Sequence, residues 1–265
     1  MTPQADALAS AAATALATAP ATARARPPAS PPQAAPAATA WALDVQDLRY
    51  RWPGASHDTL DIETLQLARG ETLFVRGPSG CGKSTLLSLL AGVMVAEHGQ
   101  VSALGQPWRA LSSARRDRFR AEHLGYIFQQ FNLLPYLSVL DNVRLPCRFA
   151  PGRAARAPAG SAESLLARTG LPERLWRQPA GALSIGQQQR VAAARALIGA
   201  PELVIADEPT SALDEGLREA FMALLLGACR EAGAALVFVS HDARLAAAFA
   251  RQLDLPTINR AAQPA

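Results

Sequence analysis

The chain has 265 residues, of which 49% are hydrophobic and 18% are charged, which is enough for one large α/β domain or two small ones. The net charge of +4 is a mild excess that fits an anionic ligand or a membrane-proximal surface and does not require nucleic acid. No run of about 18 strongly apolar residues occurs, which argues against a membrane-spanning helix. Three widely spaced cysteines form no metal-binding pattern and indicate a reducing, cytosolic compartment.

Residues 1–40 differ in composition from the rest of the chain. They are rich in Ala, Pro and Thr and contain almost no large apolar residue, so we expect a disordered tail that buries no core. The stretch also lacks the basic start and leucine-rich centre of a secretory signal. We expect the folded domain to extend over residues 41–258.

Strand and helix patterns alternate from Trp41 onward. Alternating apolar and polar residues predict a strand at 43–50, and short apolar runs predict buried strands at 71–77, 124–129, 202–207 and 234–240. Apolar periodicity predicts helices at 83–93, 185–199, 215–233 and 242–250, with more helical sequence, broken by Pro and Gly, over 130–180. Apolar strands that alternate with helices indicate a parallel sheet covered on both faces.

The segment GPSGCGKST joins the strand at 71–77 to the helix at 83–93 and fits the pattern G-x-x-x-x-G-K-[ST]. Its glycines let backbone N–H groups curl around phosphate oxygens, and the helix N-terminus adds partial positive charge. Lys83, the only lysine among 26 basic residues, is expected to bridge two phosphates, and Ser84 to bind Mg²⁺. The alternative is an ordinary glycine turn. The predicted phosphate-binding residues are Gly77, Pro78, Ser79, Gly80, Cys81, Gly82, Lys83, Ser84 and Thr85.

Polar side chains end the other predicted strands. Asp207 can hold Mg²⁺, and Glu208 can orient or deprotonate an attacking water. His241 follows the strand at 234–240 and is expected to contact the terminal phosphate, because strand ends face the ligand crevice. Gln129 ends the strand at 124–129 and can contact the metal's water and the attacking water. Each signal has an ordinary structural alternative, and their combination with the glycine loop favours a catalytic site.

The segment LSIGQQQR opens the predicted helix at 185–199 with unusual chemistry. Ser184 can be the N-cap, and Gln187 can reach back to it as in a capping box. Gly186 is a poor helix former in the first turn. The segment is either an ordinary cap or a backbone surface that meets an anion.

In their order along the chain, these segments resemble the nucleotide-binding subunits of ABC transporters: an aromatic residue before GPSGCGKST, then FQQFNLLP, LSIGQ, IADEP, and SALD followed by SHD. The resemblance covers about residues 43–255. It implies an α/β P-loop NTPase fold with a mostly parallel sheet, helices on both faces, an antiparallel β part and a helical subdomain at about 130–195. It also implies that ATP and Mg²⁺ are bound and that ATP is hydrolysed.

The resemblance assigns further roles. Trp52, with Tyr50 as the alternative, is similar to the family's adenine-stacking aromatic residue, and Asp214 lies in the loop between subunits. Gln129 is implied to be the Q-loop glutamine and His241 the switch histidine.

Residues 183–187 match the family's signature segment. In the family, this segment of one subunit closes the phosphate site of a second, so Ser184, Gly186 and Gln187 are implied to bind nucleotide across a homodimer. Ile185 stands where the family usually has glycine. A β-branched residue narrows the backbone options there, and we expect a working site.

The segments FQQFNLLPYLSVLDNVRLP and PAGALSIGQQQR look like the lipoprotein-releasing and macrolide-export type within this family. That type implies a separate integral membrane permease docked on the helical subdomain, and a cytoplasmic position, peripheral on the inner face of the plasma membrane. Nucleic acid is not an expected partner. The sequence contains four arginines at 115, 116, 118 and 120, which we expect to form a solvated helix face. The alternative is a contact with the partner or with lipid headgroups.

Several other functions of P-loop ATPases fit this sequence less well than transport does. DNA-repair relatives carry very long insertions between the P-loop and the signature, and this sequence has no such insertion between its two segments. Ribosome-acting relatives carry two cassettes in one chain, whereas this sequence shows one. A P-loop kinase would not need LSIGQ. An ATPase that drives a periplasmic enzyme, or other mechanical work without transport, is not separated from transport by the sequence.

Overall fold

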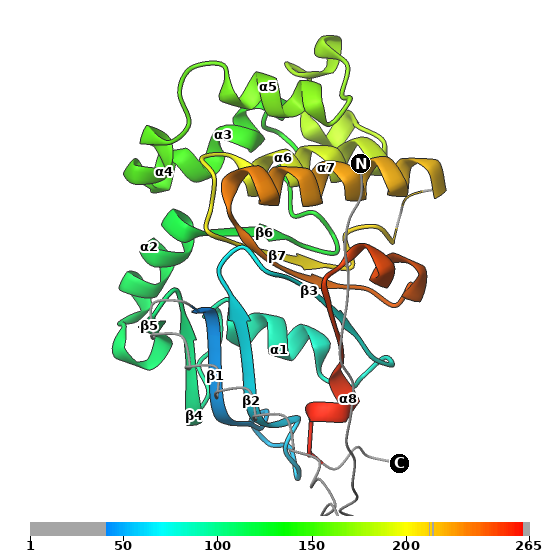
Figure 1. Ribbon diagram of the computed structural model, residues 1–265. Helices are drawn as coiled ribbons and strands as arrows, with labels where there is room; N and C mark the ends of the chain where they lie inside the picture. Colours follow the sequence, from blue (N-terminus) through cyan, green and yellow to red (C-terminus); the bar gives the residue numbers. More distant parts are fainter. Residues whose placement is uncertain (1–40, 212, 214, 262–265) are drawn as a thin grey trace, which may run out of the picture. The chain divides into compact units, whose positions relative to one another are not determined.

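The structure is a computed structural model that describes residues 41–211, 213 and 215–261 (Figure 1). The expected tail over residues 1–40 and the expected intersubunit residue Asp214 lie outside the described residues. The strands are β1 Trp41–Tyr50, β2 Leu60–Ala68, β3 Thr72–Arg76, β4 His98–Ala103, β5 Gln106–Pro107, β6 Leu124–Ile127, β7 Leu203–Asp207, β8 Ala235–Val239 and β9 Arg251–Asp254. The helices are α1 Lys83–Leu90, α2 Ser113–His123, α3 Val139–Phe149, α4 Pro151–Ala155, α5 Ser161–Arg168, α6 Ile185–Leu197, α7 Glu215–Ala232 and α8 Leu255–Ile258.

A five-stranded parallel sheet has the order β6-β7-β8-β3-β9. Val239 of β8 is in register with Val75 of β3 on one side and with Asp207 of β7 on the other. Because all five strands run the same way, the segments that follow them emerge along one edge of the sheet. This edge is where the predicted polar side chains meet.

Alternate residues of the central strands face two different apolar cores. Leu73 and Val75 of β3 pack with α1 and the antiparallel strands, whereas Phe74, between them, packs with α6 and α7. Figure 1 shows α1 on one side of the parallel sheet and α6 and α7 on the other. The near-continuous apolar strands are therefore explained by burial on both faces, which confirms the predicted fold class.

A second, antiparallel sheet has the order β2-β1-β4-β5. The pattern of β2 breaks at two consecutive exposed residues, Glu63 and Thr64, and β4 begins with the exposed residues His98 and Gln100 on either side of Gly99. In β4, the three consecutive residues from Val101 to Ala103 are buried. Neither strand therefore carries the strict alternation that predicts a strand from sequence, and both form by pairing with β1.

Helices α3, α5 and α6 enclose a third apolar core within the segment where helical sequence was expected. The division of the domain into a helical subdomain at about 130–195 stays a prediction. The predicted helix at 242–250 is a short 3₁₀ turn at Ala243–Ala248, followed by β9, which was not predicted. Asp242 caps the turn through its carboxylate, which accepts the backbone N–H of Arg244. Among the described residues, no helix combines the length and apolarity needed to cross a bilayer.

Candidate functional site

In the glycine loop between β3 and α1, two glycines adopt left-handed backbone conformations just before the helix begins. Gly80 and Gly82 have φ angles of +81° and +98°, which residues with a side chain rarely adopt. Gly82 is the N-cap of α1, and a Cβ on it would lie 2.8 Å from Cδ2 of Leu60. The glycines thus bring the chain close to β2 and leave the first N–H groups of α1 available for an anion.

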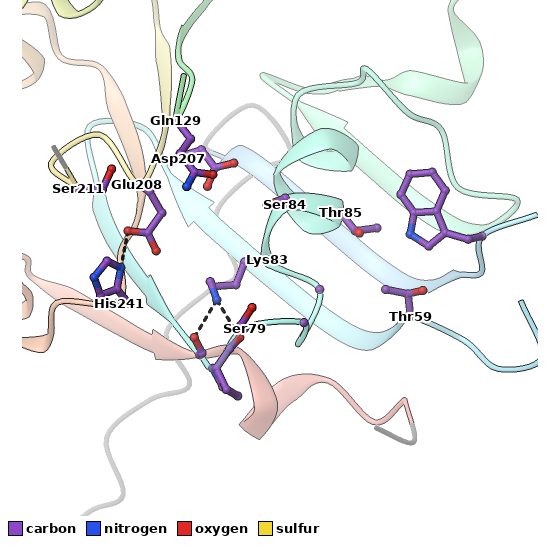
Figure 2. Close-up of a pocket in the computed structure, with 15 residues that line it drawn as sticks. Thr59, Ser79, Lys83, Ser84, Thr85, Gln129, Asp207, Glu208, Ser211 and His241 are labelled. Carbon is purple, nitrogen blue, oxygen red and sulfur yellow. Dashed lines mark hydrogen bonds and ion pairs between the residues drawn. The ribbon is translucent and has the colours of Figure 1, made fainter. Parts of the chain in front are cut away.

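Lys83 and Cys81 in this loop point in different directions. Nζ of Lys83 donates to the carbonyl oxygens of Gly77 and Pro78, both at 2.8 Å (Figure 2). Cys81 is buried in the apolar core between α1 and the sheets, where its Sγ fills the space beside Gly77. Lys83 therefore places a positive charge at the loop, while Cys81 can reach a ligand only through its backbone.

Asp207 and Ser84 meet where β7 ends beside the start of α1. Burial raises the pKa of the Asp207 carboxyl, and the charge of Glu208 adds to this. A hydrogen bond from the Ser84 hydroxyl and the charge of Lys83 lower the same pKa. A hydroxyl and a half-buried carboxylate side by side form a hard-oxygen donor set, which fits Mg²⁺.

Glu208 lies directly after Asp207 in a strained conformation. Its φ is +47°, in the left-handed region, and its backbone N–H donates to the carbonyl of Val239 at 3.0 Å. Its side chain is 13% exposed, and Oε2 lies 2.8 Å from Nδ1 of His241, whose side chain is 72% exposed (Figure 2). The edge of the sheet thus holds a carboxylate paired with an imidazole.

A single cavity of about 570 Å³ collects most of the predicted residues. It is lined by Trp52, Thr59, Gly77, Pro78, Ser79, Gly80, Gly82, Lys83, Ser84, Thr85, Gln129, Asp207, Glu208, Ser211 and His241. Thr59 and Ser211 were not predicted to line it: nothing in the local sequence marks Thr59, and Ser211 begins the SALD segment, in which only Asp214 was given a role. Trp52 lines the cavity, and its side chain is 46% exposed. The ring of Tyr50 packs edge-on against the ring of Trp52, with centroids 5.5 Å apart.

The start of α6 lies apart from this cavity within the described part of the chain. The predicted capping box is present: the backbone N–H of Ser184 donates to Oε1 of Gln187 at 3.0 Å. Gly186 lies against Leu213, whose Cδ2 would be 3.4 Å from a Cβ at that position. Ile185 is 60% exposed. Ser184, Gly186 and Gln187 therefore contribute nothing to the cavity of their own chain.

Two arginines that sequence analysis did not single out hold the loops of the site. Arg195 of α6 donates to the carbonyl of Asn132 at 2.6 Å and to that of Phe131, both just after Gln129. Burial lowers the pKa of Arg195 to about 10, so its charge persists at neutral pH. Arg218 of α7 contacts both Leu213 and Asp242.

Comparison with known proteins gives one family. The model of the ABC transporter family matches residues 60–211. An uncharacterised ABC transporter ATP-binding protein, YbbA of Escherichia coli strain K12, is 44% identical over 191 residues, which cover 72% of this chain and 83% of the relative. The lipoprotein-releasing system ATP-binding protein LolD 2 of Rhodospirillum rubrum is 45% identical over 186 residues, covering 70% and 80%. The macrolide export ATP-binding/permease protein MacB of Photorhabdus laumondii is 38% identical, covering 80% of this chain and 33% of the relative.

Solved structures agree with the family. The dimeric structure of MJ0796, described as a bacterial ABC transporter cassette, has a TM-score of 0.72 and 31% identity, and it covers 83% of this chain and 98% of that one. A second structure of MJ0796, in a post-hydrolysis state bound to ADP and Pi, has the same TM-score, identity and coverage.

Proposed function

The chain belongs to the ABC transporter family and is an ATP-binding, ATP-hydrolysing subunit, and we propose that the cavity at the edge of its parallel sheet is the nucleotide site. One observation carries this proposal. Lys83 of the glycine loop, the pair Asp207 and Glu208, and His241 come from different strand ends and line one cavity. The cavity thus offers amide and ammonium donors on one side and acid–base groups on the other.

The proposed hydrolysis uses the groups of this edge directly. The triphosphate lies along the loop, where N–H groups and Lys83 stabilise the negative charge on its oxygens. Glu208 accepts a proton from the attacking water while the bond from the γ-phosphorus to the bridging oxygen breaks, which yields ADP and phosphate. His241, 2.8 Å from Glu208, is placed to contact the γ-phosphate.

Ser84, Asp207 and Gln129 are the proposed Mg²⁺ residues. The hydroxyl–carboxylate contact and the raised pKa of Asp207 support this assignment, because a cation would relieve the cost of burying that charge. Gln129 lines the same cavity and offers an amide oxygen. When bound, the ion would neutralise charge on the phosphate oxygens.

We propose that the start of α6 serves a second copy of the chain. Ser184, Gly186 and Gln187 lie apart from their own cavity, yet they form a capped helix N-terminus, which is suited to an anion. The neighbouring structure of MJ0796 is dimeric. In a homodimer of this chain, each α6 would face the γ-phosphate bound by the other copy.

We propose an integral membrane permease as the partner that ATP hydrolysis drives, which would place this chain peripherally on the cytoplasmic face of the membrane. The relatives include a lipoprotein-releasing ATP-binding protein and a macrolide-export ATP-binding/permease protein. A groove of about 330 Å³ is lined by the apolar residues Val93, Tyr126, Phe128 and Pro146, among others. Phe128 precedes Gln129, so a permease segment in this groove would lie beside the catalytic residues.

The test of the composite site is the mass of Glu208→Gln in solution, measured by light scattering with and without ATP and Mg²⁺. Blocking hydrolysis is expected to trap an ATP-dependent dimer, and a further Ser184→Arg change is expected to return it to monomer. A protein that binds ATP and remains monomeric would contradict the composite site in the isolated subunit. A dimer that survives Ser184→Arg would contradict the role of α6.

A further inference from the structure

The side chain of Arg218 joins the two loops that flank the Glu208–His241 pair. Arg218, in the first turns of α7, donates through its Nη2 to the carbonyl oxygen of Leu213 at 3.0 Å. Its Nη1 donates to Oδ2 of Asp242 at 2.7 Å. The guanidinium therefore bridges the segment after β7 and the segment after β8, which are parallel neighbours in the sheet.

The bridge closes a ring of contacts around the catalytic pair. On one side, the backbone N–H of Ser211 donates to the carbonyl of Glu208, and that of Leu213 donates to Thr210. On the other side, Asp242 directly follows His241, and the ring is completed by the contact between His241 and Glu208. Moving Leu213 would therefore move Arg218, and through Asp242 the position of His241.

The Arg218–Asp242 contact has the features of an interaction that holds a geometry. The two side chains are only 19% and 16% exposed, so water screens them less than a surface pair. Asp242 is held at the same time by Arg244, which binds both of its oxygens at 2.9 Å. Arg244 belongs to the same segment as Asp242, so among the described residues the direct link from the Asp242 carboxylate to α7 is Arg218. Arg244 also pairs with Glu215 of α7, but both of those side chains are highly exposed.

We propose that Arg218 is a positioning residue for ATP hydrolysis: it couples Leu213 to the placement of His241 against Glu208. The inference rests on the proposed roles of these two residues. Leu213 packs over Gly186 at the start of α6, so a second subunit that docks on α6, as proposed above, would act on the catalytic pair through Leu213 and Arg218. Arg218 itself touches neither nucleotide nor water in this scheme.

The experiment compares Arg218→Met, Arg218→Lys and Asp242→Asn with the control Arg230→Met, an exposed arginine near the other end of the same helix. We expect Arg218→Met to lower kcat about tenfold with KM for ATP changed less than about twofold, because geometry is lost and nucleotide binding is kept. Arg218→Lys keeps the positive charge but loses the two-pronged guanidinium that reaches both loops, so its kcat should lie between those of Arg218→Met and the wild type. The double variant Arg218→Met/Asp242→Asn should be no slower than the slower single variant.

A second readout separates positioning from stability. In the nucleotide-free protein, the imidazole NMR signal of His241 is expected to shift in Arg218→Met and not in Arg230→Met. Unchanged kcat and an unmoved signal in Arg218→Met would overturn the proposal, as would additive effects in the double variant. Glu208→Gln is measured alongside: if it hydrolyses ATP normally, the proposed site and this inference fail together, whereas an inactive Glu208→Gln with a fast Arg218→Met overturns the inference alone.

Discussion

Nδ1 of His241 lies 2.8 Å from Oε2 of Glu208, although the two residues are 33 positions apart in the chain. The contact exists because β7 and β8 are adjacent and parallel, with Asp207 in register with Val239. A neighbouring imidazole can fix the orientation of a carboxylate and can also donate to a phosphate oxygen. The pair therefore makes a direct prediction for hydrolysis.

His241→Ala is expected to lower kcat by about 10²-fold or more, because a group that acts on the transition state is removed. ATP affinity, measured by titration with Glu208→Gln as background, should change less than about threefold, since the loop at 77–85 still binds the phosphates. His98→Ala, on the exposed part of β4, is the control and should hydrolyse ATP normally. A large loss of affinity in His241→Ala would instead place His241 in ground-state binding.

Asp207→Asn is expected to raise the melting temperature of the nucleotide-free protein while it abolishes Mg²⁺-dependent hydrolysis. The pKa of Asp207 is raised by burial and by Glu208, so the ionised carboxylate is less favourable in the folded chain than in the unfolded one. Folding stability is therefore lost as the pH rises through the ordinary carboxyl pKa of about 4 toward the raised value. Removing the charge relieves this cost at neutral pH, as seen by thermal unfolding.

The matched control for this stability change is Asp117→Asn on α2, where the carboxylate is 61% exposed and pairs with Arg120. It should leave the melting temperature nearly unchanged, because surface pairs contribute about 0–1 kcal/mol. A melting temperature that falls in Asp207→Asn would mean that the Ser84 and Lys83 contacts outweigh the burial of the charge.

Much of the parallel sheet could be predicted because its strands are continuous apolar runs between helices of strong periodicity. The helix at 215–233 begins at the residue that the sequence indicates, and the strand at 202–207 differs by one residue. β9 could not be predicted, because its four residues, Arg251–Asp254, include two charged side chains and form a strand only through pairing with β3.

The residues of the candidate site also fall into those that the sequence predicts and those that it does not. Residues inside local motifs, such as Lys83, could be assigned from the sequence because the motif itself fixes their geometry. Thr59 and Arg218 could not, because their relation to the site depends on which loops the fold brings together. The predicted helix at 242–250 failed for a related reason: Asp242 is tied to arginines on two sides, and a short 3₁₀ turn follows instead.

Asp242→Asn is expected to reduce the dependence of the free energy of unfolding on pH at acidic pH. A hydrogen bond from the Arg244 side chain, with help from the charge of Arg218, lowers the pKa of Asp242 to about 2. A lowered pKa contributes stability that is present above the ordinary value of about 4 and is lost as the pH falls from there to about 2. Between these two pH values, wild-type protein should therefore lose more unfolding free energy than Asp242→Asn, measured by urea titration at each pH. Parallel profiles would contradict the lowered pKa.

Trp52→Ala is expected to raise KM for ATP about tenfold with little change in kcat, since stacking on a base is worth about 1–3 kcal/mol and does not touch the reacting phosphate. Trp52 lines the cavity and Tyr50 only supports its edge. Trp52→Phe should keep most of the affinity, and Tyr50→Phe nearly all of it. If Tyr50→Leu raised KM and Trp52→Ala did not, the stacking residue would be Tyr50.

Ile185→Gly, made in the Glu208→Gln background, is expected to weaken the ATP-dependent dimer by about one to two orders of magnitude. Ile185 is 60% exposed in one chain and begins α6, beside the amides that are proposed to meet the second nucleotide. Covering such a side chain contributes about 1–2 kcal/mol, and glycine also loosens the first helical turn by about 0.5 kcal/mol. Sedimentation at several protein concentrations with ATP and Mg²⁺ gives the dissociation constant. Val93→Gly, at an equally exposed apolar position in the proposed permease groove, should leave that constant unchanged. A tighter dimer in Ile185→Gly would show that the branched side chain holds the two subunits apart.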